Sequence, residues 1–413
     1  MTTSSSFQPQ RVIHDLRELA ALTSDERGAQ RLAWTSAWAK ARAWFKGKLS
    51  ALPVEVEQDE AGNLWATLRG RRDDALIMGS HLDSVPNGGW LDGCLGVLAG
   101  LEALRRIAAQ DPPAVTVRLV DWADEEGARF GRSLFGSSAV AGRLNKDRIS
   151  RLVDTRGIHL PDAVRAHGVD VETAERASAQ IKHAKAYLEL HIEQGPVLES
   201  LNLPLGAVIG CYGIERHQLV FSGQAAHAGG FPMHLRHDAF LAAAEFALAA
   251  REIAQQHGGV GTNGRVRNVP DVPTAVAGEC AITLDMRHID AGQLQAMLNE
   301  AMAASARAAQ NNSVSVTWRT IYQSTPQMFD PRLIDLCEEA IRESVDGGAS
   351  HRLASGSGHD AIEMAWVGVP TVMMMVQSLR GISHAKEEDT QLEHLELAVR
   401  AFDRLATKVM MSM

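Results

Sequence analysis

Hydrophobic and polar positions follow two different periods along the first 120 residues. Apolar side chains recur at helical spacing in three segments, residues 16–20, 34–45 and 97–108. Four short apolar or β-branched runs favour strands, at residues 54–56, 64–68, 75–78 and 115–120. Strands that alternate with helices in this way predict an α/β fold, with a largely parallel sheet covered by helices.

A different pattern begins near residue 213. Strands are expected at 217–222, 280–286 and 314–318, and helices at 240–248 and 294–302. In the first of these helices, Phe240, Ala244, Ala247 and Leu248 are expected to face the core. Two helices and three or four strands predict a small α+β domain of ferredoxin-like type.

Helix–strand alternation returns from residue 325, with a strand at 369–376 and a last helix at 395–409. We therefore expect a discontinuous first domain, residues 1–212 and 325–413, into which a second domain, residues 213–324, is inserted.

Composition restricts the class of partner. The chain has 41 basic and 50 acidic residues, a net charge of −9, so we expect neither a nucleic-acid partner nor an anionic membrane surface. No apolar run approaches the roughly 20 residues that span a bilayer. The first ten residues, MTTSSSFQPQ, are expected to be a disordered tail and not a signal peptide. The four cysteines are far apart and form no CxxC pair, which favours reduced thiols in a cytoplasmic protein.

The residues that could carry chemistry cluster at predicted strand ends, where open α/β sheets bind ligands. His81 and Asp83 flank Leu82, and because positions i and i+2 of a strand share a face, the Asp83 carboxylate is expected to orient the His81 imidazole. Asp92 precedes Gly93 and a helix, so it is either a functional carboxylate or a helix N-cap.

A second group of candidates follows the next strand. Residues 121–126 contain four carboxylates, which form either a solvated acidic loop or a cluster that cations, water or protonation must neutralise. His191 lies in an alternating segment, and His384 follows an apolar strand. A lone histidine of this kind is more often structural than ligating. Five residues together supply a mixed nitrogen and oxygen ligand set suited to Zn²⁺ or to Mn²⁺, Ni²⁺ and Co²⁺: His81, Asp92, Glu126, His191 and His384.

The chain resembles the hydantoinase/carbamoylase-type amidohydrolases of the M20 group. The resemblance rests on GSHLDSVPNGGWLDGCLGVLAGLEAL, DEEGARFGRSLFGSSAVAG, HIEQGPVLE, GSGHDA and GISH, which occur in the family's order. It covers residue 12 to the end of the chain. It implies a catalytic domain that binds two metal ions, an inserted dimerisation or lid domain, and a homodimer.

The resemblance also implies roles for single residues. One metal ion would be held by His81, Asp92 and His191, and the other by Asp92, Glu126 and His384. Glu125 matches the family's general base and Asp83 its histidine-orienting carboxylate. Substrate would be bound by residues that match the family's contacts, namely His227 as oxyanion donor from the neighbouring subunit, Arg287 as carboxylate clamp, Gln194, His359 and, more weakly, Arg216. The alternative for Arg287, less favoured than the clamp, is a surface or interdomain ion pair.

The expected reaction is hydrolysis of a ureido C–N bond, because His191 stands where peptidase-like relatives place a carboxylate. The favoured substrate is an N-carbamoyl-L-amino acid, released as amino acid, CO2 and NH3. Alternatives are an allantoate amidohydrolase, a β-ureidopropionase, an M20-type peptidase or N-acyl-amino-acid deacylase, and a binding protein without catalysis. Three departures from the family pattern bear on substrate choice: Gly230 and Phe231 replace two threonines, Thr274 replaces an asparagine, and Ala277 replaces a proline.

Overall fold

The computed structural model describes residues 7–413. The chain divides into two compact units. The first consists of the part up to Ile209 together with Phe329–Met413, and the second is Gly210–Met328. The boundaries expected after residues 212 and 324 lie within four residues of these limits.

The chain is helical earlier than the sequence predicted. Helix α1 (Pro9–Thr23) begins inside the expected disordered tail, of which residues 1–6 lie outside the described part. Proline is well suited to the first turn, because its missing N–H would have no helical partner there. The backbone N–H of Gln8, just before the helix, donates to Glu102 Oε1 at 2.6 Å. The prediction was therefore wrong for the end of this segment.

A mixed β-sheet forms the centre of the first unit. Its strands run in the order β8-β18-β7-β5-β6-β4-β3, with β17 beside β8. The three pairs β18–β7, β7–β5 and β5–β6 are parallel, and the pairs on either side, β8–β18, β6–β4 and β4–β3, are antiparallel. The predicted mixed sheet is confirmed, with its parallel strands at the centre. The bounds are β3 (Glu55–Gln58), β4 (Leu64–Leu68), β5 (Ala75–His81), β6 (Thr116–Trp122), β7 (Ala184–Ile192), β8 (Leu205–Cys211), β17 (Arg352–Ser355) and β18 (Thr371–Val376).

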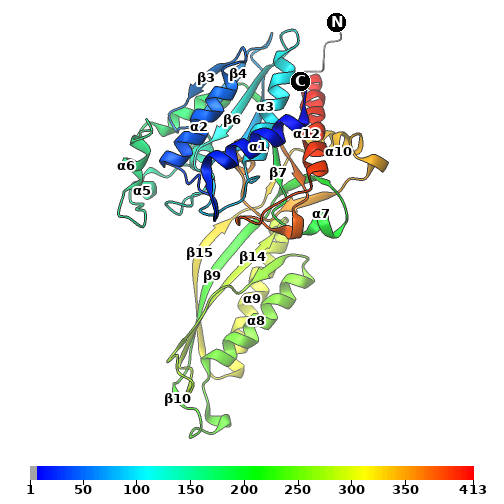
Figure 1. Cartoon of the computed structure of the whole chain (residues 1–413). Helices are drawn as coiled ribbons and strands as arrows, with labels where there is room; N and C mark the ends of the chain where they lie inside the picture. Colours follow the sequence, from blue (N-terminus) through cyan, green and yellow to red (C-terminus); the bar gives the residue numbers. More distant parts are fainter. Residues whose placement is uncertain (1–6) are drawn as a thin grey trace. The chain divides into compact units, whose positions relative to one another are not determined.

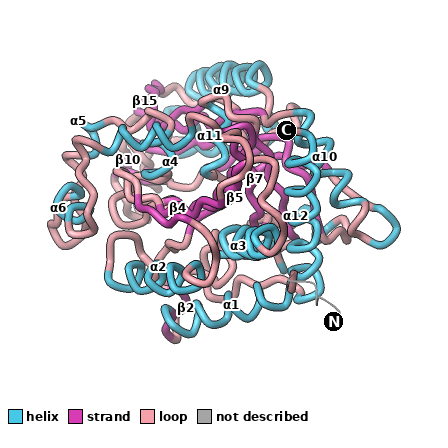
Figure 2. Tube along the Cα trace, turned by 90° about the horizontal axis from the view of Figure 1, so that it is seen from above, coloured by secondary structure: helices cyan, strands magenta, loops and turns pink. Residues whose placement is uncertain are grey.

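Helices cover both faces of this sheet. Figure 2 shows α3 and α12 on one side of β4, β5 and β7, and α4 and α11 on the other. Every residue of β4, β5, β6 and β18 is buried in consequence. The helices of this unit are α1, α2 (Ser36–Leu49), α3 (Cys94–Ala108), α4 (Phe135–Val140), α5 (Lys146–Ile149), α6 (Leu160–Arg165), α7 (Val197–Ser200), α10 (Pro331–Arg342), α11 (Asp360–Trp366) and α12 (Leu392–Ser412).

Shorter elements complete the described chain. They are the strands β1 (Ser24–Asp25), β2 (Gly28–Ala29), β10 (Ala226–His227), β13 (Ala275–Val276) and β16 (Gln327–Met328), and the 3-10 helices η1 (Ala174–Ile181), η2 (Met233–Leu235), η3 (Asp346–Gly348) and η4 (Leu379–Gly381). Strand β16 pairs with the last residues of β8, where the chain passes between the units.

The second unit has a five-stranded antiparallel sheet with two helices (Figure 1), and β10 pairs with β13 in a separate two-stranded sheet. Its elements are β9 (Gly213–Ser222), α8 (Ala239–Gln256), β11 (Val260–Thr262), β12 (Val266–Val269), β14 (Glu279–His288), α9 (Ala291–Asn311) and β15 (Ser315–Ser324). The strand order is β11-β14-β9-β15, and β12 pairs with β14 beyond β11. With β11 and β12 counted as one interrupted strand, this is the ferredoxin-like arrangement that the pattern predicted.

The buried face of α8 differs from the expected one. Phe240 and Leu248 are 42% and 57% exposed, whereas Ala242, Ala243 and Phe246 are buried against the sheet. The prediction followed the largest side chains, but small alanines at the interface let the helix approach β14 and β9 closely. Large apolar side chains are consequently left on the outer face of α8.

Two further expectations concern bilayers and thiols. Among the helices of residues 7–413, none has the length and apolar character that crossing a membrane requires. All four cysteines are buried thiols outside any disulfide, in agreement with the reduced-thiol prediction. The cytoplasmic location stays a prediction.

Candidate metal centre and catalytic site

The candidate site lies at the carboxyl ends of the parallel strands in the first unit. His81 is the last residue of β5, and His191 is the last but one of β7. Because parallel strands end at the same edge of a sheet, the topology brings residues more than a hundred positions apart into contact. Three residues near these ends, Asp124, Gln194 and His384, have left-handed backbone conformations with φ of 56°, 57° and 55°. Such strain in non-glycine residues concentrates at functional sites.

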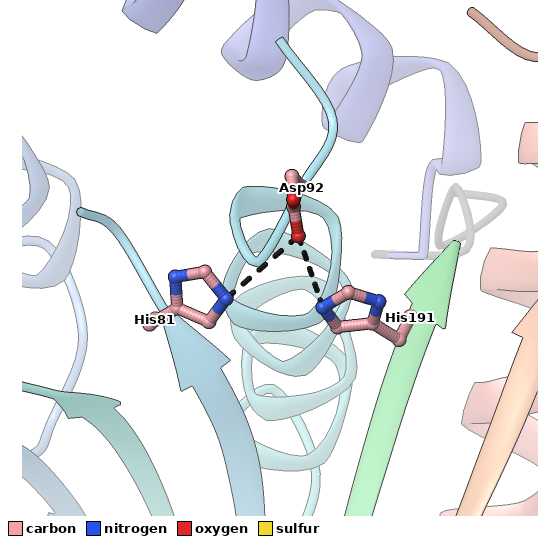
Figure 3. Close-up of side chains that lie close together, drawn as sticks. All are labelled: His81, Asp92 and His191. Atoms are coloured by element: carbon pink, nitrogen blue, oxygen red, sulfur yellow. Dashed lines mark ion pairs between the residues drawn. The ribbon is translucent and has the colours of Figure 1, made fainter. Parts of the chain in front are cut away.

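The first cluster consists of His81, Asp92 and His191. Figure 3 shows the two imidazoles on neighbouring strands, both directed at the Asp92 carboxylate from the loop before α3. Asp92 Oδ1 lies 3.2 Å from His191 Nε2 and 3.8 Å from His81 Nε2. All three side chains are buried, and their ligand atoms lie close enough together to hold one ion.

The second cluster shares Asp92 with the first. His384 Nε2 lies 3.2 Å from Asp92 Oδ2 and 3.4 Å from Glu126 Oε2. These three residues form a second group that could hold a metal ion. The two oxygens of Asp92 therefore face different clusters, which is the geometry that a bridging carboxylate requires. The N-cap interpretation of Asp92 is wrong, since Gly93 occupies the cap of α3 and no side chain caps it.

The His81 and His191 rings are oriented so that a nitrogen lone pair of each faces the first cluster. His81 Nδ1 lies 3.1 Å from the backbone carbonyl of Asp83, and His191 Nδ1 lies 2.9 Å from that of Ile192. A carbonyl accepts only, so the neutral ring carries its proton on Nδ1 and Nε2 is free to bind a cation. His191 Nε2 is buried and makes no hydrogen bond. The donor set thus fits divalent metal ions.

Asp83 has a different role from the expected one. Its carboxylate accepts hydrogen bonds from the backbone N–H groups of Glu125 and Glu126 at 3.2 and 3.1 Å, while the distance from Asp83 Oδ1 to His81 Nδ1 is 3.6 Å. The expectation failed because β5 ends at His81, so the two-residue period of a strand does not continue to Asp83. The backbone carbonyl of Asp83 orients the histidine, and its side chain holds the loop that carries Glu125 and Glu126.

The acidic run 121–126 is not a solvated loop. Asp121 is fully buried and pairs with Arg42, with 2.7 Å between Oδ2 and Nε. Asp124 is also buried and accepts from Trp34 Nε1 at 2.6 Å. These two carboxylates have fixed protein partners. Glu125 and Glu126 are directed to the clusters instead.

Glu125 lies beside the first cluster, with Oε2 at 3.6 Å from His81 Nε2, and is 7% exposed. Burial, and then the charges of Asp360 and Glu126, raise the pKa of Glu125 well above its ordinary value. Burial and the neighbouring Asp92 raise the pKa of Glu126 to about 8. Bound cations reverse these shifts because they stabilise the ionised carboxylates. Without cations, these shifts favour the protonated form of both glutamates, so ionised carboxylates at this site depend on bound positive charge.

Two more predicted residues lie at the same site. Gln194 Nε2 is 3.0 Å from Asp92 Oδ2, and its Oε1 is buried without a hydrogen-bond partner. His359 is buried beside His191, with 4.5 Å between ring centroids, and its Nε2 lies 2.9 Å from Ser355 Oγ. Burial lowers the pKa of His359 well below its ordinary value, so its ring is neutral.

Four predicted residues belong to the second unit. His227 is exposed, and its Nδ1 accepts from the backbone N–H groups of Gly229 and Gly230 at 3.2 and 3.0 Å. Its neutral ring therefore carries the proton on Nε2, as an oxyanion donor must. Thr274 lies beside the His227 segment, because its backbone carbonyl accepts a hydrogen bond from the N–H of Ala228 at 2.9 Å.

Arg287 and Arg216 lie on adjacent strands of the second unit and share Asp285. Asp285 Oδ1 is 2.7 Å from Arg287 Nε, and Oδ2 is 2.6 Å from Arg216 Nε. The sequence identified both arginines but missed the carboxylate that joins them. It also missed Ser383 and Glu388, which lie on either side of His384 and contact the Asp92 segment. Their proximity to His384 was the only available signal.

Comparisons with known proteins agree with this geometry. Residues 77–408 match the family described as peptidase family M20/M25/M40. The N-carbamoyl-L-amino-acid amidohydrolase of Paenarthrobacter aurescens is 32% identical, over 95% of this chain and 96% of its own. The allantoate amidohydrolase of Escherichia coli is 33% identical, over 90% of this chain and 91% of its own. The crystal structure of a hydantoinase/carbamoylase family amidase from Burkholderia multivorans has a TM-score of 0.89 at 29% identity, covering 97% of this chain and 98% of its own.

Removal of divalent ions should destabilise the protein measurably. An ion that binds only the folded chain stabilises it by about 2.7 kcal/mol at a free concentration of 100 Kd. We expect EDTA to lower the Tm of wild-type protein loaded with Co²⁺, and the Tm of Asp92→Asn to respond much less. Asp111→Asn, an exposed change far from the clusters in sequence, is the control and should respond like wild type. A wild-type Tm that is the same with EDTA and with Co²⁺ would contradict the metal assignment.

Proposed function

The chain belongs to peptidase family M20/M25/M40, and from this premise we propose that it is a metal-dependent amidohydrolase that cleaves a ureido C–N bond. The observation that carries the proposal is the Asp92 carboxylate, whose two oxygens face separate ligand pairs beside Glu125. Relatives that cover nine-tenths or more of the chain are N-carbamoyl-L-amino-acid and allantoate amidohydrolases. An N-carbamoyl-L-amino acid is the favoured substrate.

We propose two divalent ions per chain, Zn²⁺ or Mn²⁺, with Co²⁺ and Ni²⁺ also compatible with the donors. The first would be held by His81, Asp92 and His191, and the second by Asp92, Glu126 and His384. When bound, such ions polarise the scissile carbonyl and acidify the attacking water.

Side chains of the protein transfer the proton and bind the substrate. Glu125 accepts a proton from the water that attacks the carbamoyl carbon and returns it to the leaving nitrogen as the C–N bond breaks. Gln194 Oε1, a buried acceptor without a partner, suits a substrate N–H. His227 of a neighbouring copy of the chain presents Nε2–H to the developing oxyanion, and Arg287 binds the substrate carboxylate, with Arg216 beside it.

Allantoate hydrolysis is the second candidate. Allantoate also carries a carboxylate and ureido groups, and the allantoate relative is as similar to this chain as the carbamoylases are. The next candidate in order of preference is a β-ureidopropionase activity, and after it a peptidase or N-acyl-amino-acid deacylase activity. The departures at Gly230, Phe231 and Thr274 lie in the second unit, so they concern substrate choice and not the metal ligands.

A substrate panel tests the proposed activity. Ammonia release is measured from N-carbamoyl-L-methionine, N-carbamoyl-β-alanine and allantoate with Co²⁺- or Mn²⁺-loaded protein, and an N-acetyl amino acid is followed by amine release. We expect the highest kcat/KM for the N-carbamoyl-L-amino acid. Turnover of the N-acetyl amino acid alone would contradict the ureido assignment.

Arg287→Ala is the matched variant for this panel. It should raise KM for carboxylate substrates at least about 10-fold and leave kcat/KM for a carboxylate-free ureido compound unchanged, since a clamp contacts only the carboxylate. Equal losses on both compounds would remove the clamp assignment.

Glu125→Gln should lower kcat at least about 100-fold while the protein keeps its metal content. The amide preserves the shape of the side chain but cannot accept the proton, and general-base removal costs at least this factor. Metal content is measured by inductively coupled plasma mass spectrometry. Glu60→Gln, an exposed change in the same unit, is the control. Unchanged turnover would reject the role of Glu125.

We further propose that the chain forms a homodimer through its second unit. Of the twenty large hydrophobic side chains that are exposed among the described residues, thirteen lie between residues 210 and 328, including Phe240, Leu241 and Leu248 on α8. Exposed apolar side chains gathered in this way mark interaction surfaces.

Sedimentation velocity should therefore give twice the chain mass of 44.7 kDa. The double variant Leu241→Lys, Leu248→Lys should shift the protein toward monomer. Val153→Lys, at an exposed apolar position of the first unit, should not. A wild-type monomer at micromolar concentration would contradict the dimer.

A further inference from the structure

Glu388 is a buried carboxylate that joins two segments of the site, almost three hundred residues apart in the sequence. It is 2% exposed and lies four residues after His384, in the loop that precedes α12. We propose that Glu388 is a positioning residue, which fixes the Asp92 carboxylate between the two clusters and holds His384 against it. The inference rests on the proposed metal-dependent function.

The first contacts fix the backbone of Asp92. Glu388 Oε1 accepts hydrogen bonds from the N–H groups of Leu91 and Asp92, both at 3.0 Å. Asp92 follows an irregular segment, and helix α3 begins only at Cys94. Glu388 is therefore the side chain that holds the residue from which the shared carboxylate projects.

The second contacts reach the Asp92 side chain through Ser383. Glu388 Oε2 lies 2.9 Å from Ser383 Oγ, which in turn lies 3.2 Å from Asp92 Oδ2. Asp92 Oδ2 is the oxygen that faces His384. The Ser383 hydroxyl has one proton, so it donates to one of these two carboxylates at a time. Glu388 thus restrains the main chain of Asp92 directly and keeps Ser383 beside the ligand oxygen of Asp92.

His384 needs such an anchor more than the other histidines do. Its side chain is 50% exposed, whereas those of His81 and His191 are buried, and its backbone is left-handed. The turn after it closes when the Glu388 N–H donates to the carbonyl of Ala385 at 3.0 Å. Ser383 on one side of His384 and Glu388 on the other bind each other, so the histidine sits in a closed loop.

The packing at Gly89 is independent evidence that Glu388 lies very close to the segment that contains Asp92. A Cβ atom at residue 89 would lie 2.0 Å from Glu388 Oε1 and 2.5 Å from Glu388 Cβ. The side chain cannot turn away from such a contact, because its own Cβ is involved. Glycine at this position therefore permits the carboxylate to reach the N–H groups of residues 91 and 92.

Metal binding and cobalt spectroscopy test the inference without any ureido substrate. Metal-free Glu388→Ala, Glu388→Gln and wild type are titrated with Co²⁺ while the visible d–d absorption is recorded. Loss of an outer hydrogen-bond partner of a ligand typically costs 10–100-fold in metal affinity. We expect Glu388→Ala to bind Co²⁺ at least about 10-fold more weakly and with an altered d–d spectrum.

The conservative variant and a steric variant separate positioning from general loss of structure. Glutamine keeps an oxygen acceptor for the two N–H groups, and its amide N–H can donate to Ser383 Oγ, which then donates to Asp92 Oδ2. Glu388→Gln should therefore stay within about 3-fold of wild type. Gly89→Ala should reproduce the loss seen in Glu388→Ala. Glu387→Ala, an exposed neighbour in the same loop, is the control and should bind Co²⁺ normally.

Two results would overturn the inference: wild-type Co²⁺ affinity and spectrum in Glu388→Ala, or an equal defect in Glu388→Gln. A crystal structure of metal-free Glu388→Ala should show Asp92 Oδ2 and His384 Nε2 farther apart than 3.2 Å, and an unchanged separation would also overturn it. Because none of these readouts uses substrate, failure of the ureido assignment in the substrate panel leaves this test intact.

Discussion

The constraint on which the site depends is the burial of several carboxylates at one edge of the sheet. Asp83, Asp92, Asp121, Asp124 and Glu125 are all at most 7% exposed. A buried carboxylate is costly unless hydrogen bonds or positive charge compensate it. The structure compensates Asp121 with Arg42, Asp124 with Trp34, and Asp83 with two backbone N–H groups. Asp92, Glu125 and Glu126 have mainly histidines beside them, and these are the residues that divalent ions would neutralise.

This division explains why the acidic run resists a simple assignment from sequence. Four carboxylates in six residues look alike in a one-dimensional pattern, but two serve the fold and two face the clusters. Strand β6 fixes Asp121 toward Arg42, and the turn after it, with its left-handed Asp124, sends Glu125 and Glu126 toward β5. The sequence could predict that the run was important. The role of each carboxylate could not be predicted, because it depends on contacts with Arg42 and Trp34, which are some eighty to ninety residues away in the sequence.

Much of the fold and the cluster membership could be predicted because the signals are local. Strands β4 and β5 coincide with apolar runs in the sequence. His81 and His191 lie at strand ends, which the parallel topology brings together. The failures arose where tertiary contacts decide. Alanine packing buried the unexpected face of α8, and the end of β5 broke the period assumed for Asp83. Glu388 carried no periodic signal at all, since its partners are backbone N–H groups almost three hundred residues earlier.

The distribution of residues between the units bears on how specificity can change while chemistry is kept. Every candidate metal ligand, with Glu125, belongs to the first unit, whereas His227, Thr274 and Arg287 belong to the second. Gly230 replaces a threonine in the family pattern, but it is the backbone N–H of this residue that binds His227 Nδ1, and a main-chain donor survives a change of side chain. The proton on His227 Nε2 is therefore set by the main chain, not by the replaced side chains. Under the proposed function, substitutions at residues 230, 231 and 274 alter the shape offered to a substrate and leave the tautomer of this histidine intact.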